Sequence, residues 1–501
     1  MPADSSQRAY KDESEHKQAP WLLAFSVLLV AGLAFFADRV HSQSSTFTAT
    51  TIYFPQAATT SVYSAETTLP YHKNASYPYL GQAPTQAAFP SLSTPTGSHC
   101  VVTPLGWGQD DSSQILAAVE QCGVNGTITL PAPYVYTVSH RMHMYLENAR
   151  FEIFGTLSFT PDLTYWIDNS FRVEFQNQST AWIVEGQNFT IDGGGWMQGG
   201  VDGNGQAWMT HAAGLSNQFG RPIVLSIYNA SNVVITNFSI RQPQFWSFWV
   251  QDSYNVEISS VCINGTNTDP YGNSSNFETN IDGLDSLRVD HLLIKDWVFH
   301  GGDDCLAPKG NTTNMLISNM TCVGGGIAFG SIGQYVDSPD YISNVTATNI
   351  SVSQDVNPRT GGAAVAGGAY FKSWVGKEEG TPPQGGGGGT GRVSNVTFQG
   401  LTTHNTSQAV FINKCYFKVA DQANYCDTST LEFEDLSFSD VSGTVSGKVG
   451  VGLNCSAAAP CENIAFANVH LSNSATNASA SLTCVNARNV TGLTCNSTIT
   501  S

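Results

Sequence analysis

NVVITNFSI (232–240) is followed by NVEISSVCI (255–263), which begins 23 residues later and repeats the same pattern. A polar residue comes first, and apolar residues then alternate with polar ones, as in strands with one buried face. Repeats about this long, with no helix between them, predict coils that stack into a solenoid. The pattern returns, at first 28 to 31 residues apart, in SLRVDHLLI (286–294), NMLISNMTC (314–322), NVTATNISV (344–352), NVTFQGLTT (395–403), LEFEDLSFS (431–439), NIAFANVHL (463–471) and NVTGLTC (489–495).

A parallel β-helix fits this spacing best, so we predict an all-β fold in which one chain winds into a single-stranded, right-handed solenoid. One coil cannot bury its apolar side alone, so its neighbours must cover it and the end needs a cap. DDSSQILAAVEQCG (110–123) has helical apolar spacing and ends in glycine, which predicts a short N-terminal capping helix. An antiparallel sandwich is the alternative, but the hairpin signals that it requires are sparse.

Composition divides the chain before the repeats into three segments. Residues 1–20 are polar, and WLLAFSVLLVAGLAFFA (21–37) is a signal peptide or an uncleaved signal anchor, two interpretations that both stay open. Residues 38–98 are rich in Ser, Thr and Pro, which indicates an extended stalk. We therefore assign the β-helix domain to 99–501 and place it outside the cell, secreted or facing outward from a membrane anchor.

The charge and the motifs exclude several functions. A net charge of −18 with only 12% charged residues argues against nucleic acid and anionic membranes as partners. No C-x-x-C pair occurs, so we expect no zinc site, and we expect no cofactor and a monomer. About eighteen N-x-S/T sequons fit a glycoprotein of the secretory route.

The eleven cysteines are spaced as if for local bridges in an oxidising compartment, with Cys262 left over. The expected pairs are Cys100–Cys122, Cys305–Cys322, Cys415–Cys426, Cys455–Cys461 and Cys484–Cys495.

HGGDDCLAPKG (300–310) places two aspartates side by side, which indicates either a solvated turn or a site that handles protons. Aligned residues of stacked coils lie about 4.8 Å apart. Asp282 precedes Asp303 by 21 residues, one short coil, so Asp282, Asp303 and Asp304 should share one face. Repulsion among three carboxylates keeps one protonated while others ionise, and glycoside hydrolysis needs such an acid and base.

Four motifs, in this order and spacing, resemble glycoside hydrolase family 28, the polygalacturonases and their relatives. They are NIDG (280–283), GGDDC (301–305), GGGIAFGSIG (324–333) and AYFKSW (369–374). Residues 100–495 are similar to its exo-acting fungal members. The resemblance implies a pectin-lyase-like right-handed β-helix and single-displacement hydrolysis with inversion.

The same resemblance implies roles for the three acids. Asp303 matches the general acid, and Asp282 and Asp304 match the pair that activates water. Inverting enzymes hold acid and base roughly 6.5–9.5 Å apart, and we expect that spacing here. We expect Cys305 and Cys322 to clamp the two coils of the site together.

Two positions depart from the family pattern. Gly325 stands where a histidine is usual, and Tyr370 stands where an arginine is usual, while Lys372 is kept. The family uses these cations to bind substrate carboxylates, and tyrosine cannot reproduce the bidentate grip of arginine. Tyr370 either packs or offers a flat face to a sugar ring.

The loss of positive charge predicts a less anionic sugar at the cleaved bond. We therefore predict an exo-acting pectin hydrolase for rhamnogalacturonan or terminal α-L-rhamnose. One alternative is an exo-polygalacturonase that releases terminal galacturonate, with Lys372, Lys309 and Arg288 binding its carboxylate. The others are a catalytically silent protein that binds the cell wall and a membrane-tethered stalk protein.

Overall fold

A computed structural model of the chain describes residues 68–69, 92, 94–173, 175–215, 217–268, 278–355, 367–417 and 419–495. The predicted segments 1–20 and 21–37 lie outside these residues, as does most of 38–98. Over the described ranges, no helix is both long enough and apolar enough to cross a bilayer.

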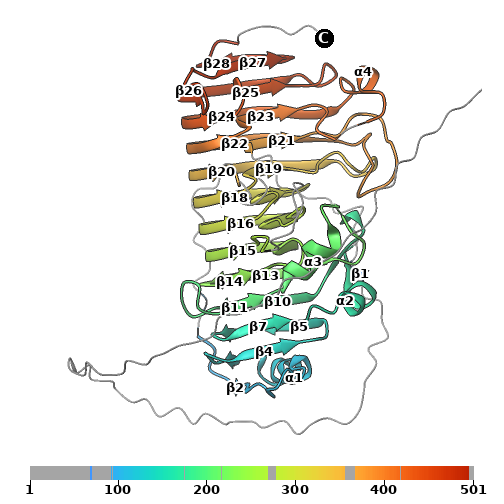
Figure 1. The fold of residues 1–501 in the computed structure, drawn as a ribbon, viewed down its shortest axis with the longest axis vertical. Helices are drawn as coiled ribbons and strands as arrows, with labels where there is room; N and C mark the ends of the chain where they lie inside the picture. Colours follow the sequence, from blue (N-terminus) through green and yellow to red (C-terminus); the bar gives the residue numbers. More distant parts are fainter. Residues whose placement is uncertain are drawn as a thin grey trace, which may run out of the picture. The chain divides into compact units, whose positions relative to one another are not determined.

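The predicted solenoid is confirmed: the strands stack in parallel, coil upon coil, as a parallel β-helix (Figure 1). One stack consists of the long strands that carry the sequence repeats, and each pairs in parallel with the next. These strands are β10 (Trp182–Asp192), β13 (Leu225–Thr236), β15 (Phe248–Asn264), β16 (Leu284–His300), β18 (Thr312–Val323), β20 (Asp340–Ser353), β22 (Thr390–Thr406), β24 (Thr430–Val445), β26 (Cys461–Asn473) and β28 (Ala487–Thr491).

A second stack of short strands begins beside the first residues of β16 and runs toward the C-terminal coils. Its members are β17 (Leu306–Pro308), β19 (Ile327–Phe329), β21 (Gly367–Lys372), β23 (Gln408–Asn413), β25 (Val449–Asn454) and β27 (Ser481–Val485).

The N-terminal coils use shorter strands, and four strands form a separate small sheet in which only β8 and β9 are antiparallel. The coil strands are β2 (His99–Val101), β3 (Thr127–Leu130), β4 (Val135–Val138), β5 (Met142–Glu147), β6 (Arg150–Ile153), β7 (Thr156–Phe159), β11 (Gly200–Asp202) and β14 (Ser239–Arg241). The small sheet contains β1 (Thr68–Leu69), β8 (Phe171–Val173), β9 (Gln178–Thr180) and β12 (Pro222–Ile223). Strand β1 lies within the segment 38–98.

The predicted capping helix is α1 (Ser112–Cys122), which begins after Asp111 and ends at Gly123. Ile115, Ala118 and Val119 of this helix join the apolar core, so α1 covers the first coil (Figure 1). The remaining helices are α2 (Leu163–Asn169), α3 (Gly205–Ala212), α4 (Gln422–Tyr425) and the 3₁₀ turn η1 (Phe175–Asn177).

The register of the coils confirms most repeats and corrects two. Val233 pairs with Val256, as the repeats predict, but Val256 pairs with Leu292. The repeat in β16 therefore begins at His291, five residues after the predicted start at Ser286. The segment inserted before β16 lengthens this coil.

The repeat in β24 is the second that the register corrects. Val396 and Ile464 both pair with Leu436, so the repeat in β24 begins at Asp435, four residues after the predicted start at Leu431. The register is set by the positions that are buried in the core, and not by similarity of the sequence.

The asparagines that open many repeats have a structural reason. Asn232, Asn255, Asn314 and Asn344 all have positive φ, a conformation that asparagine tolerates better than most residues. The side-chain amide of Asn255 donates to Asn232, and that of Asn344 donates to Asn314, so these corners are bonded from coil to coil.

All five predicted disulfides are confirmed, and Cys262 is free. Cys305–Cys322 joins the turn before β17 to the end of β18, so it ties together consecutive coils at the GGDDC motif, as predicted.

Candidate active site

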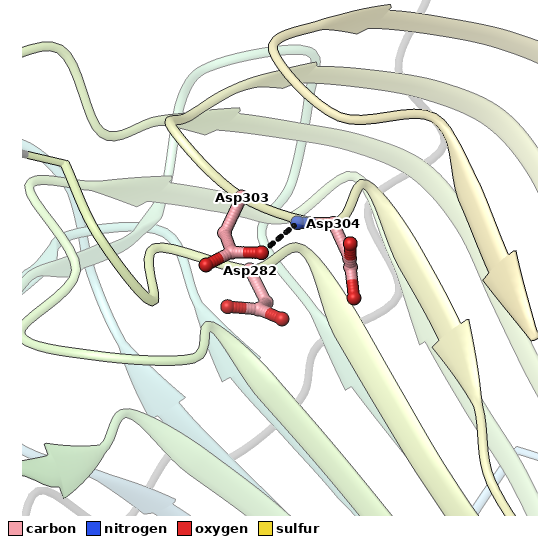
Figure 2. A group of neighbouring side chains, drawn as sticks. All are labelled: Asp282, Asp303 and Asp304. Atoms are coloured by element: carbon pink, nitrogen blue, oxygen red, sulfur yellow. Dashed lines mark hydrogen bonds between the residues drawn. The ribbon is translucent and has the colours of Figure 1, made fainter. Parts of the chain in front are cut away.

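Three aspartates converge at the turns that lead into β16 and β17. Asp282 lies just before β16, and Asp303 and Asp304 lie between β16 and β17. One carboxylate oxygen from each residue lies within 4.8 Å of the others. Figure 2 shows Asp282 beneath Asp303, with Asp304 beside them. The predicted cluster therefore exists on one face, although its roles follow from the surroundings of each acid.

The register of the cluster differs by one residue from the prediction. Leu284 pairs with Leu306, and the backbone N–H of Gly283 donates to the carbonyl of Asp304 at 2.9 Å. Asp282 is thus aligned with Asp304 rather than with Asp303, because this coil has 22 residues instead of 21. Asp303 occupies the additional position in the turn, and one of its carboxylate oxygens still lies within 4.8 Å of a carboxylate oxygen of Asp282.

Asp304 is held by two donors from β21. The hydroxyl of Tyr370 donates to one carboxylate oxygen, and the ammonium group of Lys372 donates to the other. Burial alone would lower the pKa of Lys372, but Asp304 and its other neighbours raise it above its usual value. Lys372 is therefore a cation, and its ammonium group forms an ion pair with the carboxyl group of Asp304.

Asp303 has a different environment. The residue keeps some exposed surface. Among the described residues, its carboxyl group accepts hydrogen bonds only from the backbone N–H groups of Asn280 and Asp304, each at 3.1 Å. Burial and the neighbouring Asp304 raise the pKa of Asp303 to about 6. A carboxyl group that keeps its proton near pH 6 is suited to donating that proton to a leaving group.

Asp282 is as deeply buried as Asp304. It is 3% exposed, and its Oδ1 has no hydrogen-bond partner among the described residues. Burial, followed by the charge of Asp303, raises the pKa of Asp282 well above its usual value. Burial therefore favours the protonated form of both Asp282 and Asp303, whereas Asp304 is paired with Lys372.

The separation of the acids is shorter than expected. We expected roughly 6.5–9.5 Å between acid and base, whereas the nearest oxygens of the three groups lie within 4.8 Å. A water molecule donates to each oxygen over about 2.7 Å. Oxygens at this separation can therefore hold one water between two carboxylates, but the spacing itself does not indicate inversion.

Gly325 explains why a histidine is absent at this position. A Cβ atom at Gly325 would lie 2.5 Å from the carbonyl oxygen of Asp303 and 3.0 Å from the Cα of Asp304. The backbone N–H of Gly325 donates to that carbonyl at 2.9 Å. The coil under the GGDDC turn approaches so closely that no side chain fits without displacing the turn.

The cations predicted to bind substrate are each paired with a protein carboxylate. Besides Lys372 with Asp304, Lys309 lies 2.7 Å from Asp285, and the guanidinium of Arg288 binds both oxygens of Asp252. Lys309 is 3% exposed, so it is not a surface lysine.

Tyr370 and the tryptophans near the site pack inside the protein. Tyr370 is 3% exposed, and its ring stacks on Phe411 at 5.1 Å, so its face is not available to a sugar. Trp374 stacks on Phe417 at 4.2 Å, and Trp246 stacks on Trp249 at 5.6 Å. Of the two roles considered for Tyr370, packing is confirmed, with its hydroxyl on Asp304 as an additional contact.

Two loops meet over the sheet beside the acids, a feature that the sequence did not reveal. The side chain of Gln176 donates to Gln334 at 2.7 Å, and its backbone N–H donates to the hydroxyl of Tyr335 at 2.7 Å. Below them, Phe175 stacks on Trp249 at 5.5 Å. Trp249 is paired in register with Asp285, three residues after Asp282. We call this contact between 175–177 and 334–335 the loop bridge.

Sequence comparisons identify relatives over most of the chain. The pattern of the family described as "Glycosyl hydrolases family 28" matches residues 122–360 and 379–495. "Putative galacturan 1,4-alpha-galacturonidase A" of Aspergillus flavus is 45% identical over 417 residues, 80% of this chain and 94% of that protein. "Alpha-L-rhamnosidase rgxB" of Aspergillus niger is 32% identical over 375 residues, 74% of this chain and 83% of that protein.

A solved structure supports the fold independently. The crystal structure of an endo-xylogalacturonan hydrolase from Aspergillus tubingensis matches with a TM-score of 0.68 at 24% identity. The match covers 80% of this chain and 99% of that chain, so the coils correspond along nearly the whole of that protein.

Proposed function

The chain belongs to glycosyl hydrolases family 28, and from that premise we propose that it is an exo-acting pectin hydrolase whose general acid is Asp303. Asp282 and Asp304 are the proposed pair that holds the attacking water. The different surroundings of the three acids support this division of roles.

In the proposed reaction, the carboxyl group of Asp303 donates its proton to the glycosidic oxygen as the bond from that oxygen to the anomeric carbon breaks. Water held between Asp282 and Asp304 attacks the anomeric carbon from the opposite face and forms the new C–O bond. Asp304, which is paired with Lys372, accepts the proton of this water. The products are the free sugar and the shortened polymer, and the anomeric configuration is inverted.

The loop bridge is the observation that carries the exo assignment. Phe175 of the bridge stacks on Trp249 and covers it. The ammonium of Lys309 lies 5.7 Å from the centre of the Phe175 ring and 5.0 Å from the centre of the Trp246 ring. These residues belong to the sheet surface next to the acids. A long polymer lying across this surface would collide with the bridge, so the geometry favours attack at a chain end.

A neutral sugar at the cleaved bond is favoured by the pairing of the cations. Lys372, Lys309 and Arg288 bind Asp304, Asp285 and Asp252, respectively. Tyr370 adds no positive charge. A substrate carboxylate would have to compete with these internal carboxylates, whereas the hydroxyl groups of an α-L-rhamnose would not. We therefore propose rhamnogalacturonan with a terminal rhamnose as the substrate.

Terminal galacturonate is the second candidate. The relative from Aspergillus flavus, 45% identical, is named as a galacturonidase, while the relative named as a rhamnosidase is 32% identical. In this alternative Lys372 would exchange Asp304 for the carboxylate of the sugar.

Product analysis tests the proposal. The purified protein is incubated with rhamnogalacturonan oligomers ending in rhamnose or in galacturonate, with polygalacturonate, and with aryl α-L-rhamnoside and aryl α-galacturonide. We expect single rhamnose residues to be released from the chain end. Galacturonate alone would favour the second candidate, rapid internal cleavage of polygalacturonate would overturn the exo assignment, and no product from any substrate would indicate a silent wall-binding protein.

We also propose that the protein acts outside the cell. Five disulfides support this location because such bonds persist in oxidising compartments. Whether 21–37 is a cleaved signal peptide or an anchor, and whether the protein is a monomer, remain predictions from the sequence.

A further inference from the structure

Arg221, which lies between Gly220 and the small-sheet strand β12, is a buried cation that the proposed mechanism does not use. Its relative exposure is 0%, although arginine is rarely buried completely. It makes no ion pair within the described ranges, and its Nη2 has no hydrogen-bond partner there. A buried charge without a direct counter-ion is costly, so a compensating charge must lie nearby.

The contacts of Arg221 connect it to the loop that carries the acids. Its Nη1 donates to the carbonyl of Thr279 at 3.0 Å, and its Nε donates to the carbonyl of Gln244 at 2.5 Å. The next residue after Thr279 is Asn280, whose backbone N–H donates to Asp303. Asp282 follows two residues later. Arg221 therefore fixes the segment that orients two of the three acids.

The charges that act on Arg221 are those of the same acids. Burial lowers the pKa of Arg221 to about 10, and the negative charges of Asp282 and Asp303 oppose this shift. The attraction is mutual, so the guanidinium favours ionisation of Asp282 and Asp303 in the same way. Lys372, in contrast, is bonded to Asp304.

We infer that Arg221 is a positioning residue that supplies the positive charge next to Asp282 and Asp303, where this chain lacks the usual histidine and arginine. The inference rests on the proposed function. Because Gly325 and Tyr370 stand where cations are usual, Asp282 and Asp303 have no bonded cation among the described residues. Without a positive charge nearby, both carboxyl groups would tend to remain protonated. With Arg221 holding the segment that carries Asp282, ionisation of one acid of the pair is favoured while the other keeps its proton for the leaving group.

Other charged groups also face the acid pair and must be kept constant in a test. Asp304, Asp285 and Lys309 act on Asp282 from the surrounding coils. Asp304 and Lys372 act on Asp303. Tyr416, which lies after β23, lies close enough for both acids to raise its own pKa. None of these groups is altered by a substitution at Arg221.

The pH dependence of hydrolysis is the first test. Wild type, Arg221→Gln and Arg221→Lys are compared on the substrate that the wild type cleaves fastest. We expect Arg221→Gln to move the acidic limb of the kcat profile upward by about 1 pH unit, the lower end for losing an opposite charge. Arg221→Lys keeps the charge and should restore more than half of that shift. A uniform loss of kcat at every pH, with no shift, would overturn the inference.

Arg288→Gln is a matched control because Arg288 is also buried but is paired with Asp252. It should lower the melting temperature without moving the acidic limb. If Arg288→Gln moves the acidic limb as far as Arg221→Gln does, loss of any buried arginine shifts the pH profile. That result would also overturn the inference.

A second measurement does not depend on activity. Thermal unfolding near pH 7 is measured for Arg221→Gln, Asp282→Asn and the double variant. If Arg221 balances the acid pair, its removal should lower the melting temperature less when Asp282 is already neutral. Equal losses in both backgrounds would overturn the inference. A wild type that hydrolyses none of the substrates would instead overturn the proposed function, and this cycle would still decide the role of Arg221.

Discussion

Asp303 and Asp304 are neighbours in sequence, but their surroundings give them different chemistry. Asp304 accepts hydrogen bonds from the ammonium of Lys372 and the hydroxyl of Tyr370, whereas the hydrogen bonds to Asp303 within the described part of the chain come from backbone N–H groups. Two carboxyl groups in such different environments separate into an acid and a base. The sequence predicted which acids meet, but only the contacts of β21 show which one is paired with a cation.

Replacing Asp303 with asparagine should abolish proton donation while leaving the turn intact. We expect kcat on unactivated oligosaccharides to fall by about 10²–10⁴, the usual contribution of a general acid. The loss should be smaller on aryl glycosides, whose leaving groups need less protonation. Asp168→Asn, at an exposed position of α2, is the control and should retain activity. Unchanged hydrolysis by Asp303→Asn would contradict the assignment.

Gly325→His tests whether the glycine is required here. Although histidine is usual at this motif position, its Cβ would collide with the carbonyl of Asp303. We expect at least about a tenfold loss of activity and a lower melting temperature, because overpacking a closely packed site displaces its backbone. A variant that gains activity on polygalacturonate would show that the turn accommodates the histidine.

At the level of coils and loops, the predictions succeeded where the pattern is local. The helix expected over 110–123 is α1, and the cysteine pairs lie within or between adjacent coils. The start of the repeat at 286–294 was predicted five residues too early, because similar sequence patterns occur at two registers of β16. The loop bridge was missed because its halves lie more than 150 residues apart and neither carries a recognisable motif.

The loop bridge predicts the mode of attack. Tyr335→Phe removes the acceptor for the backbone N–H of Gln176, and Gln334→Ala removes the acceptor for its side chain. In the double variant we expect internal cleavage, seen as intermediate oligosaccharides during early hydrolysis by chromatography. The matched control is Tyr341→Phe, which changes an exposed tyrosine of β20. If the double variant still releases only single sugars, the bridge does not determine exo action.

Across the whole molecule, a solenoid with few charges nevertheless buries several carboxyl groups. Burial raises the pKa of Asp285 and of Asp303 to about 6, and that of Asp340 to about 7. The pKa of aspartate in the unfolded chain is about 3.9. Between these values the folded protein binds more protons than the unfolded chain, so its free energy of unfolding falls as the pH rises.

Stability should therefore be greater at pH 5 than at pH 7.5. We expect the free energy of unfolding to fall by about 2 kcal/mol or more over this interval, since each pKa unit is worth about 1.4 kcal/mol. Thermal or denaturant unfolding across the range would measure it. Asp340→Asn should make the dependence less steep, because it removes one of the shifted groups. Stability that is constant or that rises with pH would contradict this explanation.

The configuration of the first product tests the central claim, that three acids on adjacent coils carry out a single displacement. Proton NMR during the first minutes of hydrolysis of a terminal α-linked oligosaccharide identifies the anomer before mutarotation. The account predicts the β anomer, released one sugar at a time and lost in Asp303→Asn. Initial release of the α anomer would contradict it, because retention would require one of these aspartates to act as a nucleophile, as their close spacing would otherwise allow.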